Sequence, residues 1–179
     1  MHDYTGCVMS IDPSGRGKDE TGFAVVKALA GNLFLTEAGG LTGGYEVETL
    51  EGLAHVAKRN KVKYIIIEAN FGDGMFTSLL KPILARIYPC TVEEVRHSTQ
   101  KEARIIDTLE PVMTGHRLIV DQRVIQKDFD TAPDIKYSLF YQLTRLTRDR
   151  GAIVHDDRLD ALAIAVAYWV ESMGRDNNK

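Results

Sequence analysis

The chain has 179 residues, of which 44% are hydrophobic and 26% charged, the composition of one ordinary globular domain. No apolar run approaches the ~20 residues of a membrane-spanning helix, and the first residues do not begin a signal peptide, so we expect a protein that is neither secreted nor membrane-bound. The net charge of −3 argues against a generally basic nucleic-acid coat, but it does not exclude a nuclease. Cys7 and Cys90 lack metal-site spacing and favour a reduced, intracellular protein.

The first third of the chain predicts three strands in succession, which is typical of an antiparallel meander. They span residues 6–11, 21–28 and 33–38, and a turn over 30–32 joins the last two. A helix is predicted over 45–60, where Leu50, Leu53, Ala54 and Ala57 share one face. A short apolar run over 64–67 then predicts a buried strand.

The rest of the chain predicts helices separated by short extended segments. Helices are expected over 75–88, 101–113, 123–130, 137–148 and 156–173, extended segments over 92–96 and 117–120, and a loop over 131–136. The last helix carries an apolar stripe of Leu159, Leu162, Ala163, Val166 and Val170. This order predicts one α/β domain over 1–179, with a mixed sheet of antiparallel and parallel strands flanked by helices. Because the chain begins abruptly on a strand, we expect it to come from a longer protein.

Three acidic sites each lie beside an apolar run. Asp12 follows the first strand, Glu68 follows three isoleucines, and residues 155–160 (HDDRLD) open the last helix. A carboxylate at the end of a buried strand costs desolvation energy unless it is paired or holds a metal. Ligand sites of α/β sheets lie at such strand ends, and carboxylate oxygens suit Mg²⁺ or Mn²⁺. The pattern therefore predicts a metal-dependent phosphoryl-transfer site.

Each acidic site also has a purely structural interpretation. Asp12 could form hydrogen bonds within a turn, and Glu68 could pair with a nearby cation. Asp156 could cap the last helix, in which case it would point away from the site. Asp157 and Asp160 are three residues apart, so both can face one site.

The loop after Asp12 is rich in glycine and contains Arg16 and Lys18, which could suggest phosphate binding. It does not match a P-loop, because Asp19 follows the lysine where serine or threonine is required. His155, beside the acidic cluster, is more simply a loop residue than a proton-transfer group.

The segments IDPSGRGKDETGFAVV (11–26), YIIIEANFGDG (64–74) and GAIVHDDRLDALAIAV (151–166) together resemble the nuclease domain of bacteriophage terminase large subunits. These are DNA-packaging motor proteins, and the similarity is greatest to those of short-tailed phages, including segments 106–113 and 136–141. The resemblance covers nearly the whole chain. It implies a ribonuclease H-like fold and a metal-dependent endonuclease that cuts concatemeric viral double-stranded DNA during genome packaging. The N-terminal ATPase domain of a full terminase is absent, so this domain alone should not hydrolyse ATP.

The resemblance also implies roles for individual carboxylates. By motif position, Asp12, Glu68 and Asp157 are the catalytic metal ligands, and they hold two Mg²⁺ or Mn²⁺ ions that Asp12 bridges. Additional positions that could bind metal are Asp19, Asp156 and Asp160, the last matching an aspartate of Holliday-junction resolvases.

DNA contact requires local cations. The principal candidates are Arg16, Lys18, Lys101, Arg104 and Arg158, and the wider set adds Arg96, His97, Lys136, Arg145 and Arg148. Contacts with phosphates position a duplex without reading its bases, which suits a nuclease of low sequence preference.

The resemblance implies several partners: double-stranded DNA, the ATPase domain of the full protein, the small terminase subunit and the portal. We expect the isolated domain to be monomeric, and the full protein to act in the host-cell cytoplasm, transiently at the procapsid portal.

Three alternatives remain open. A resolvase of the same fold would be a dimer that prefers branched DNA. An actin-like nucleotide-binding module would need a second phosphate loop, and the sequence offers no residues for one. A docking domain with a dead site is disfavoured by the intact acidic set.

Overall fold

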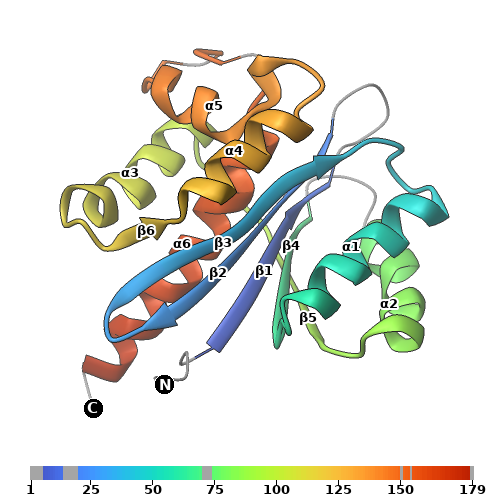
Figure 1. The fold of residues 1–179 in the computed structure, drawn as a ribbon. Coiled ribbons are helices and arrows are strands. Elements are labelled where there is room, and N and C mark those ends of the chain that lie inside the picture. The colour runs from blue at the N-terminus through green and yellow to red at the C-terminus, as the bar shows by residue number, and fades with distance from the viewer. Residues whose placement is uncertain (1–5, 14–19, 70–73, 150, 154, 178–179) are drawn as a thin grey trace.

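A mixed six-stranded sheet forms the centre of the molecule (Figure 1). The computed structural model describes residues 6–13, 20–69, 74–149, 151–153 and 155–177. The strands are β1 (Gly6–Asp12), β2 (Thr21–Leu29), β3 (Asn32–Leu41), β4 (Tyr64–Glu68), β5 (Thr91–Val95) and β6 (Leu118–Val120). Their order across the sheet is β5-β4-β1-β2-β3-β6. The meander β1-β2-β3 is antiparallel, and the other neighbouring pairs are parallel, so the predicted mixed sheet is confirmed.

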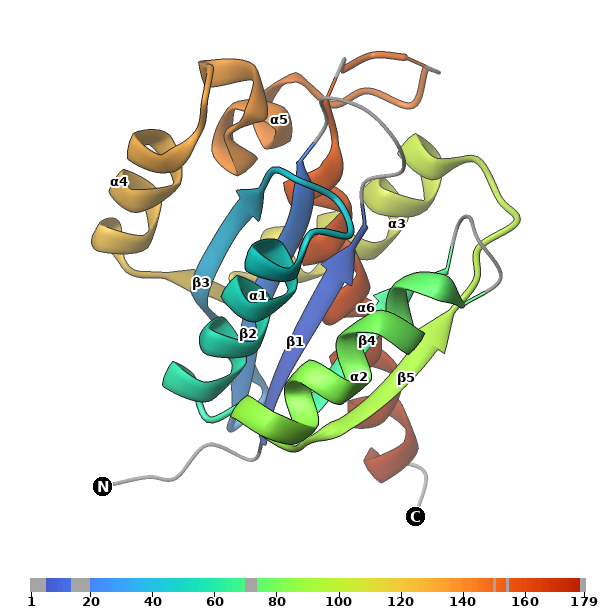
Figure 2. The same ribbon diagram turned by 90° about the vertical axis from the view of Figure 1, so that its right-hand side faces the viewer.

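Helices cover both faces of this sheet (Figure 2). They are α1 (Val47–Arg59), α2 (Met75–Ile87), α3 (Lys101–Thr114), α4 (Gln122–Thr131), the 3₁₀ helix η1 (Ile135–Tyr137), α5 (Leu139–Arg145) and α6 (Asp157–Asn177). Helices α1 and α2 pack on one face, whereas α6 crosses the other face together with α3 and α5. Helix α4 lies along β3, at the edge of the sheet that also carries β6.

The alternation of side chains along β1 divides the core in two. Cys7, Met9 and Ile11 are buried against α1 and α2, whereas Val8 belongs to the core beneath α6. Ser10, on the same face as Val8, donates a hydrogen bond to the Ala161 carbonyl of α6. Because strand side chains alternate with a period of two, Asp12 continues the Val8–Ser10 face and is directed towards α6.

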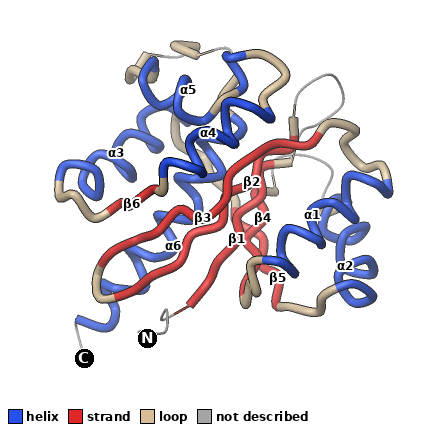
Figure 3. The backbone as a smooth tube through the Cα atoms, in the orientation of Figure 1, coloured by secondary structure: helices blue, strands red, loops and turns tan. Residues whose placement is uncertain are grey.

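Figure 3 shows these helices and strands along the backbone, and most of them lie close to the ranges that the sequence predicts. The predicted helix over 137–148 is shorter, because the 3₁₀ turn η1 and the Ser138 cap precede α5, which ends at Arg145. Val170, which the sequence predicts in the apolar stripe of the last helix, is instead 40% exposed. Among the described residues, no helix has both the length and the apolar character needed to cross a membrane.

Candidate active site

The ends of β1 and β4 bring two of the predicted carboxylates together. These strands are parallel, with Ile11 opposite Ile67, so the next pair in register is Asp12 and Glu68. Both side chains follow the strand alternation onto the α6 face, and each is only 2% exposed. The first two acidic sites of the sequence therefore meet at one buried location.

The start of α6 supplies the remaining carboxylates, and a glycine allows it to approach. Gly22 of β2 lies opposite Asp12, and a β-carbon built on it would be 2.8 Å from the Arg158 amide nitrogen and closer still to the Asp157 carbonyl. Only a residue without a side chain fits between these two backbones. The first turn of α6 thus lies directly against the strand pair that presents Asp12.

Asp12 is shared by two groups of carboxylates. One contains Asp12, Glu68 and Asp160, all buried, and the other contains Asp12, Asp156 and Asp157, of which the last two are partly exposed. Within each group, one oxygen from every residue lies within 4.8 Å of the others. The site therefore has an inner and an outer set of oxygen ligands, with Asp12 common to both.

Two cations from the first turn of α3 enter this acidic cluster. The Lys101 ammonium lies 3.3 Å from Asp156, 3.5 Å from Asp160 and 3.7 Å from Asp12. The Arg104 guanidinium lies 2.9 Å from Asp160 and 3.5 Å from Glu68. The two basic side chains therefore neutralise part of the charge of both carboxylate groups.

Burial and crowding shift the ionisation of the inner carboxylates. Desolvation, followed by the charge of Asp160, raises the pKa of Asp12 well above its ordinary value. Desolvation and the contact with Glu68 raise the pKa of Asp160 to about 7. Burial alone would raise the pKa of Glu68, but the proton of Asp160, a hydrogen bond with His97 and the charges of Lys101 and Arg104 lower it to about 2. Asp160 and Glu68 therefore share one proton near neutral pH.

The inner oxygens are well suited to a cation. Oε2 of Glu68 is buried and has no hydrogen-bond partner among the described residues, and the buried oxygens of Asp160 meet positive charge only through their ion pairs with Lys101 and Arg104. Buried carboxylate oxygens are costly unless positive charge compensates them, so a cation at this position would stabilise the cluster further. His97 Nδ1 lies 3.1 Å from Glu68 Oε1 and can fix the orientation of that ligand. The residues present thus fit a hard divalent metal.

Comparison with known proteins establishes the family. The family described as "Terminase Bacteriophage T7, Ribonuclease H-like domain" matches residues 11–118, more than half of the chain. The chain belongs to this family. It is 46% identical over 192 residues to the terminase large subunit of Enterobacteria phage T3, in an alignment covering 98% of this chain and 33% of the T3 protein. The terminase resemblance deduced from the sequence is confirmed, and this chain spans about a third of that relative.

Solved terminase domains share the fold at low sequence identity. The manganese-soaked, inhibitor-bound nuclease domain of human cytomegalovirus terminase has a TM-score of 0.64 and 15% identity, covering 93% of this chain and 84% of that one. A K428A mutant nuclease domain of the large terminase subunit gp2 of bacterial virus Sf6, with manganese and beta-thujaplicinol, has a TM-score of 0.62 and 13% identity, covering 91% and 88%. The predicted ribonuclease H-like fold of the terminase domain is confirmed.

The structure corrects the prediction for Arg158 in this terminase domain. Arg158 was expected to contact DNA, but its side chain is fully buried. Its guanidinium donates two hydrogen bonds to Glu20, of 2.9 and 3.0 Å, and one of 2.9 Å to Asp128 of α4. Asp128 in turn accepts from the amides of Leu139 and Phe140 at the start of α5. Arg158 thus connects the first turn of α6 to the residue that precedes β2 and, through Asp128, to α4 and α5.

The prediction that Asp156 points away from the site is also wrong. That prediction requires Asp156 and Asp157 to be successive helical residues, whose side chains diverge by about 100°. Asp156 instead precedes the first helical residue, and the side chains of both Asp156 and Asp157 approach Asp12. The sequence motif also gave Asp160 only a secondary role, whereas its fully buried side chain belongs to the inner group of carboxylates.

Of the remaining candidates, Lys101 and Arg104 lie within the carboxylate cluster, and Arg16, Lys18 and Asp19 lie outside the described residues. His97 was considered only as a DNA contact, because no local signal in the sequence shows that the segment after β5 returns to Glu68. That contact follows from the pairing of β5 beside β4.

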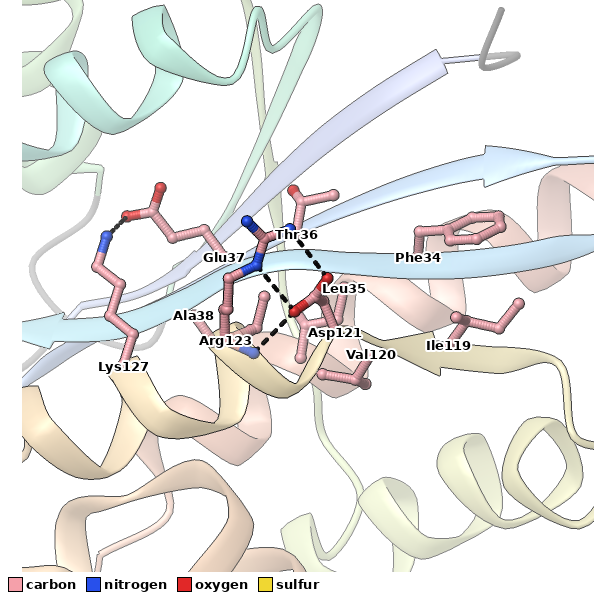
Figure 4. Close-up of a pocket in the computed structure, with 11 residues that line it drawn as sticks. Phe34, Leu35, Thr36, Glu37, Ala38, Ile119, Val120, Asp121, Arg123 and Lys127 are labelled. Carbon is pink, nitrogen blue, oxygen red and sulfur yellow. Dashed lines mark hydrogen bonds and ion pairs between the residues drawn. The ribbon is translucent and has the colours of Figure 1, made fainter. Parts of the chain in front are cut away.

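A hollow of about 640 Å³ over β3 and β6 offers a comparison (Figure 4). Its charged groups already have partners within the protein. Lys127 lies 3.4 Å from Glu37, and Arg123 lies 3.2 Å from Asp121. Arg59 and Asn60 also bind Glu37. This hollow lacks the converging carboxylates that mark the site at the start of α6.

Proposed function

We propose that this domain is a metal-dependent endonuclease that cuts concatemeric viral double-stranded DNA during genome packaging, by two-metal hydrolysis of phosphodiesters. The observation that carries the proposal is the position of Asp12 as the shared member of two carboxylate groups. Two divalent ions bound to adjacent groups with one bridging carboxylate form the usual arrangement for phosphodiester hydrolysis. The family match and the manganese named in the viral neighbours support the same function.

The residues that would hold the ions follow from the two groups. Glu68 and Asp160 would bind Mg²⁺ or Mn²⁺ at the inner position, and Asp156 and Asp157 at the outer position, with Asp12 between them. Bound there, the metals would activate a water molecule and neutralise charge that develops on the phosphate. This assignment adds Asp160 to the ligands that the sequence motif selected.

The chain's own residues supply orientation and charge balance. His97 holds Glu68 by its 3.1 Å contact, and Arg158 fixes the turn that carries Asp157 and Asp160. Lys101 is 32% exposed and competes for the same carboxylates that would bind metal. If those carboxylates held divalent ions, the Lys101 ammonium would be available to contact a DNA phosphate. The predicted DNA contacts of Lys101 and Arg104 are retained in this form.

The larger assembly is part of the proposal. The T3 relative is a terminase large subunit about three times the length of the aligned region. We infer that a full protein would join this domain to an ATPase domain, bind the small terminase subunit and the portal, and act in the host-cell cytoplasm. The domain alone would be monomeric and unable to hydrolyse ATP.

Plasmid cleavage tests the proposal directly. The purified domain should nick or cut duplex DNA with Mn²⁺ or Mg²⁺, and excess EDTA should abolish the activity. Asp12→Asn should be inactive, whereas Asp130→Asn, at an exposed position of α4, should cut normally. Cleavage that persists in EDTA would contradict the metal mechanism. A stable dimer that prefers four-way junctions to linear duplex would favour the resolvase alternative.

A further inference from the structure

A second hollow is lined by two cations for which the described part of the chain provides no acidic partner. It has a volume of about 420 Å³ and is bounded by Lys136, Tyr141, Arg145, Ala152 and Ile153. Neither Lys136 nor Arg145 forms an ion pair with any described residue, and both are exposed. This differs from the hollow of Figure 4, where Lys127 and Arg123 are both paired with carboxylates. Two uncompensated cations beside one cavity favour an anionic ligand.

The cationic side chains stand on a rigid support. The Arg145 guanidinium lies 5.0 Å from the centre of the Tyr141 ring, so a cation–π contact holds it over the hollow. The Ser138 side chain and the buried Asp128 carboxylate cap the start of α5, the helix that carries Tyr141 and Arg145. The Gln142 side-chain amide donates a 3.2 Å hydrogen bond to the Lys136 carbonyl. The backbone around the hollow is therefore fixed before any ligand binds, which reduces the entropy cost of binding.

The wall of the hollow is connected along the chain to the carboxylate site. Its wall at Ala152 and Ile153 belongs to the connection between α5 and α6, which leads into Asp156 and Asp157. Glu102, which follows Lys101 in α3, accepts a 3.0 Å hydrogen bond from the Gly151 amide of this connection. On the other side, Tyr137 stacks on His155, with ring centres 3.8 Å apart. In Figure 1, α5 and the start of α6 lie at the same end of the molecule.

We propose that this hollow binds a backbone phosphate of the DNA strand at a position away from the phosphodiester being cut. The inference rests on the proposed function, and it names a part of the substrate site that the carboxylates cannot provide. Without metal, the acidic cluster repels DNA, so a separate cationic anchor is needed to bring the strand to it. Lys136 supplies a point charge and Arg145 planar N–H donors, which together suit phosphate oxygens. Contacts of this kind are independent of base sequence.

The salt dependence of DNA binding tests the anchor. Binding of a labelled duplex in EDTA, where cleavage is absent, would be compared between the wild type and Lys136→Gln/Arg145→Gln over a range of NaCl concentrations. Loss of one neutralised phosphate should weaken binding and lower the slope of log K against log salt by about 0.9. The matched control is Arg123→Gln/Lys127→Gln, which removes the same charge from the hollow of Figure 4 and should leave the slope unchanged. Circular dichroism would verify that both double variants are folded. If Lys136→Gln/Arg145→Gln did not fold, the single variant Lys136→Gln would be used in its place.

Cleavage assays separate this inference from the proposed function. If the wild type cuts DNA with Mn²⁺, the double variant at Lys136 and Arg145 should raise KM more than it lowers kcat. If that variant bound duplex DNA with wild-type affinity and the wild-type salt slope, the proposed phosphate site would be wrong and the nuclease proposal would be unaffected. A reduced slope in a domain that never cuts with metal would support DNA binding in the hollow and overturn the nuclease proposal. Equal losses in both double variants would show a general effect of net charge, which also overturns the anchor.

Discussion

Replacing Gly22 with alanine should damage the metal site more than it damages the fold. The new β-carbon would lie 2.8 Å from the Arg158 amide nitrogen, whereas ordinary contact begins at 3.4 Å. The start of α6 must then retreat by at least the difference, 3.4 − 2.8 = 0.6 Å, because both partners are backbone. Metal–ligand distances tolerate only about 0.2 Å. Overpacking of this kind costs about 1–3 kcal/mol of unfolding free energy, which the two cores can absorb.

The assay compares Gly22→Ala with Gly6→Ala, which also crowds α6 but at its far end. A β-carbon on Gly6 would lie 2.8 Å from the Trp169 ring. Urea unfolding should show a loss of stability in both variants. Calorimetric titration with Mn²⁺ should show an affinity loss of about 10–100-fold in Gly22→Ala alone, the size expected when support of metal ligands is disturbed. Equal Mn²⁺ affinity in the two variants would show instead that the carboxylates tolerate displacement of α6.

Four further outcomes are expected. Asp12→Asn should raise the metal-free melting temperature by removing a buried like charge, and a lower value in EDTA would show a structural role instead. Lys101→Met should bind Mn²⁺ more tightly while melting at a lower temperature without metal, and unchanged affinity would mean that the ammonium does not compete with the ion. Metal-free stability should fall as pH rises from about 4 to 7, because folded Asp160, with its pKa of about 7, keeps a proton that the unfolded chain has lost; urea titrations with a flat or rising profile would contradict this. Asp160→Asn should abolish cleavage and Asp156→Asn should reduce it, and a fully active Asp160→Asn would remove that residue from the ligand set.

The sequence predicted the sheet and the meeting of Asp12 with Glu68 for a simple physical reason. Alternation along β1 and the run of isoleucines in β4 specify buried strands whose last residues are acidic. Once the strands are parallel neighbours, their ends coincide, and the register places the two carboxylates side by side. Local pattern and strand pairing therefore suffice for this half of the site.

The other half depends on contacts between distant segments, which local patterns do not encode. Arg158 is buried because its guanidinium binds Glu20 and Asp128. These partners lie 138 and 30 residues away along the chain, respectively. The position of Lys101 depends on how α3 packs beside α6. The direction of the Asp156 side chain depends on where the helix begins, and the helix begins one residue later than the sequence predicts.

We propose that Asp12 is the shared ligand of a two-cation site, and an anomalous diffraction map from crystals of the domain soaked in Mn²⁺ would show whether it is. We predict two peaks, both coordinated by Asp12, one also by Glu68 and Asp160 and the other by Asp156 and Asp157, with the Lys101 ammonium displaced from its carboxylate contacts. A map with no peak at Asp12, with Lys101 still bound between Asp12, Asp156 and Asp160, would contradict the account.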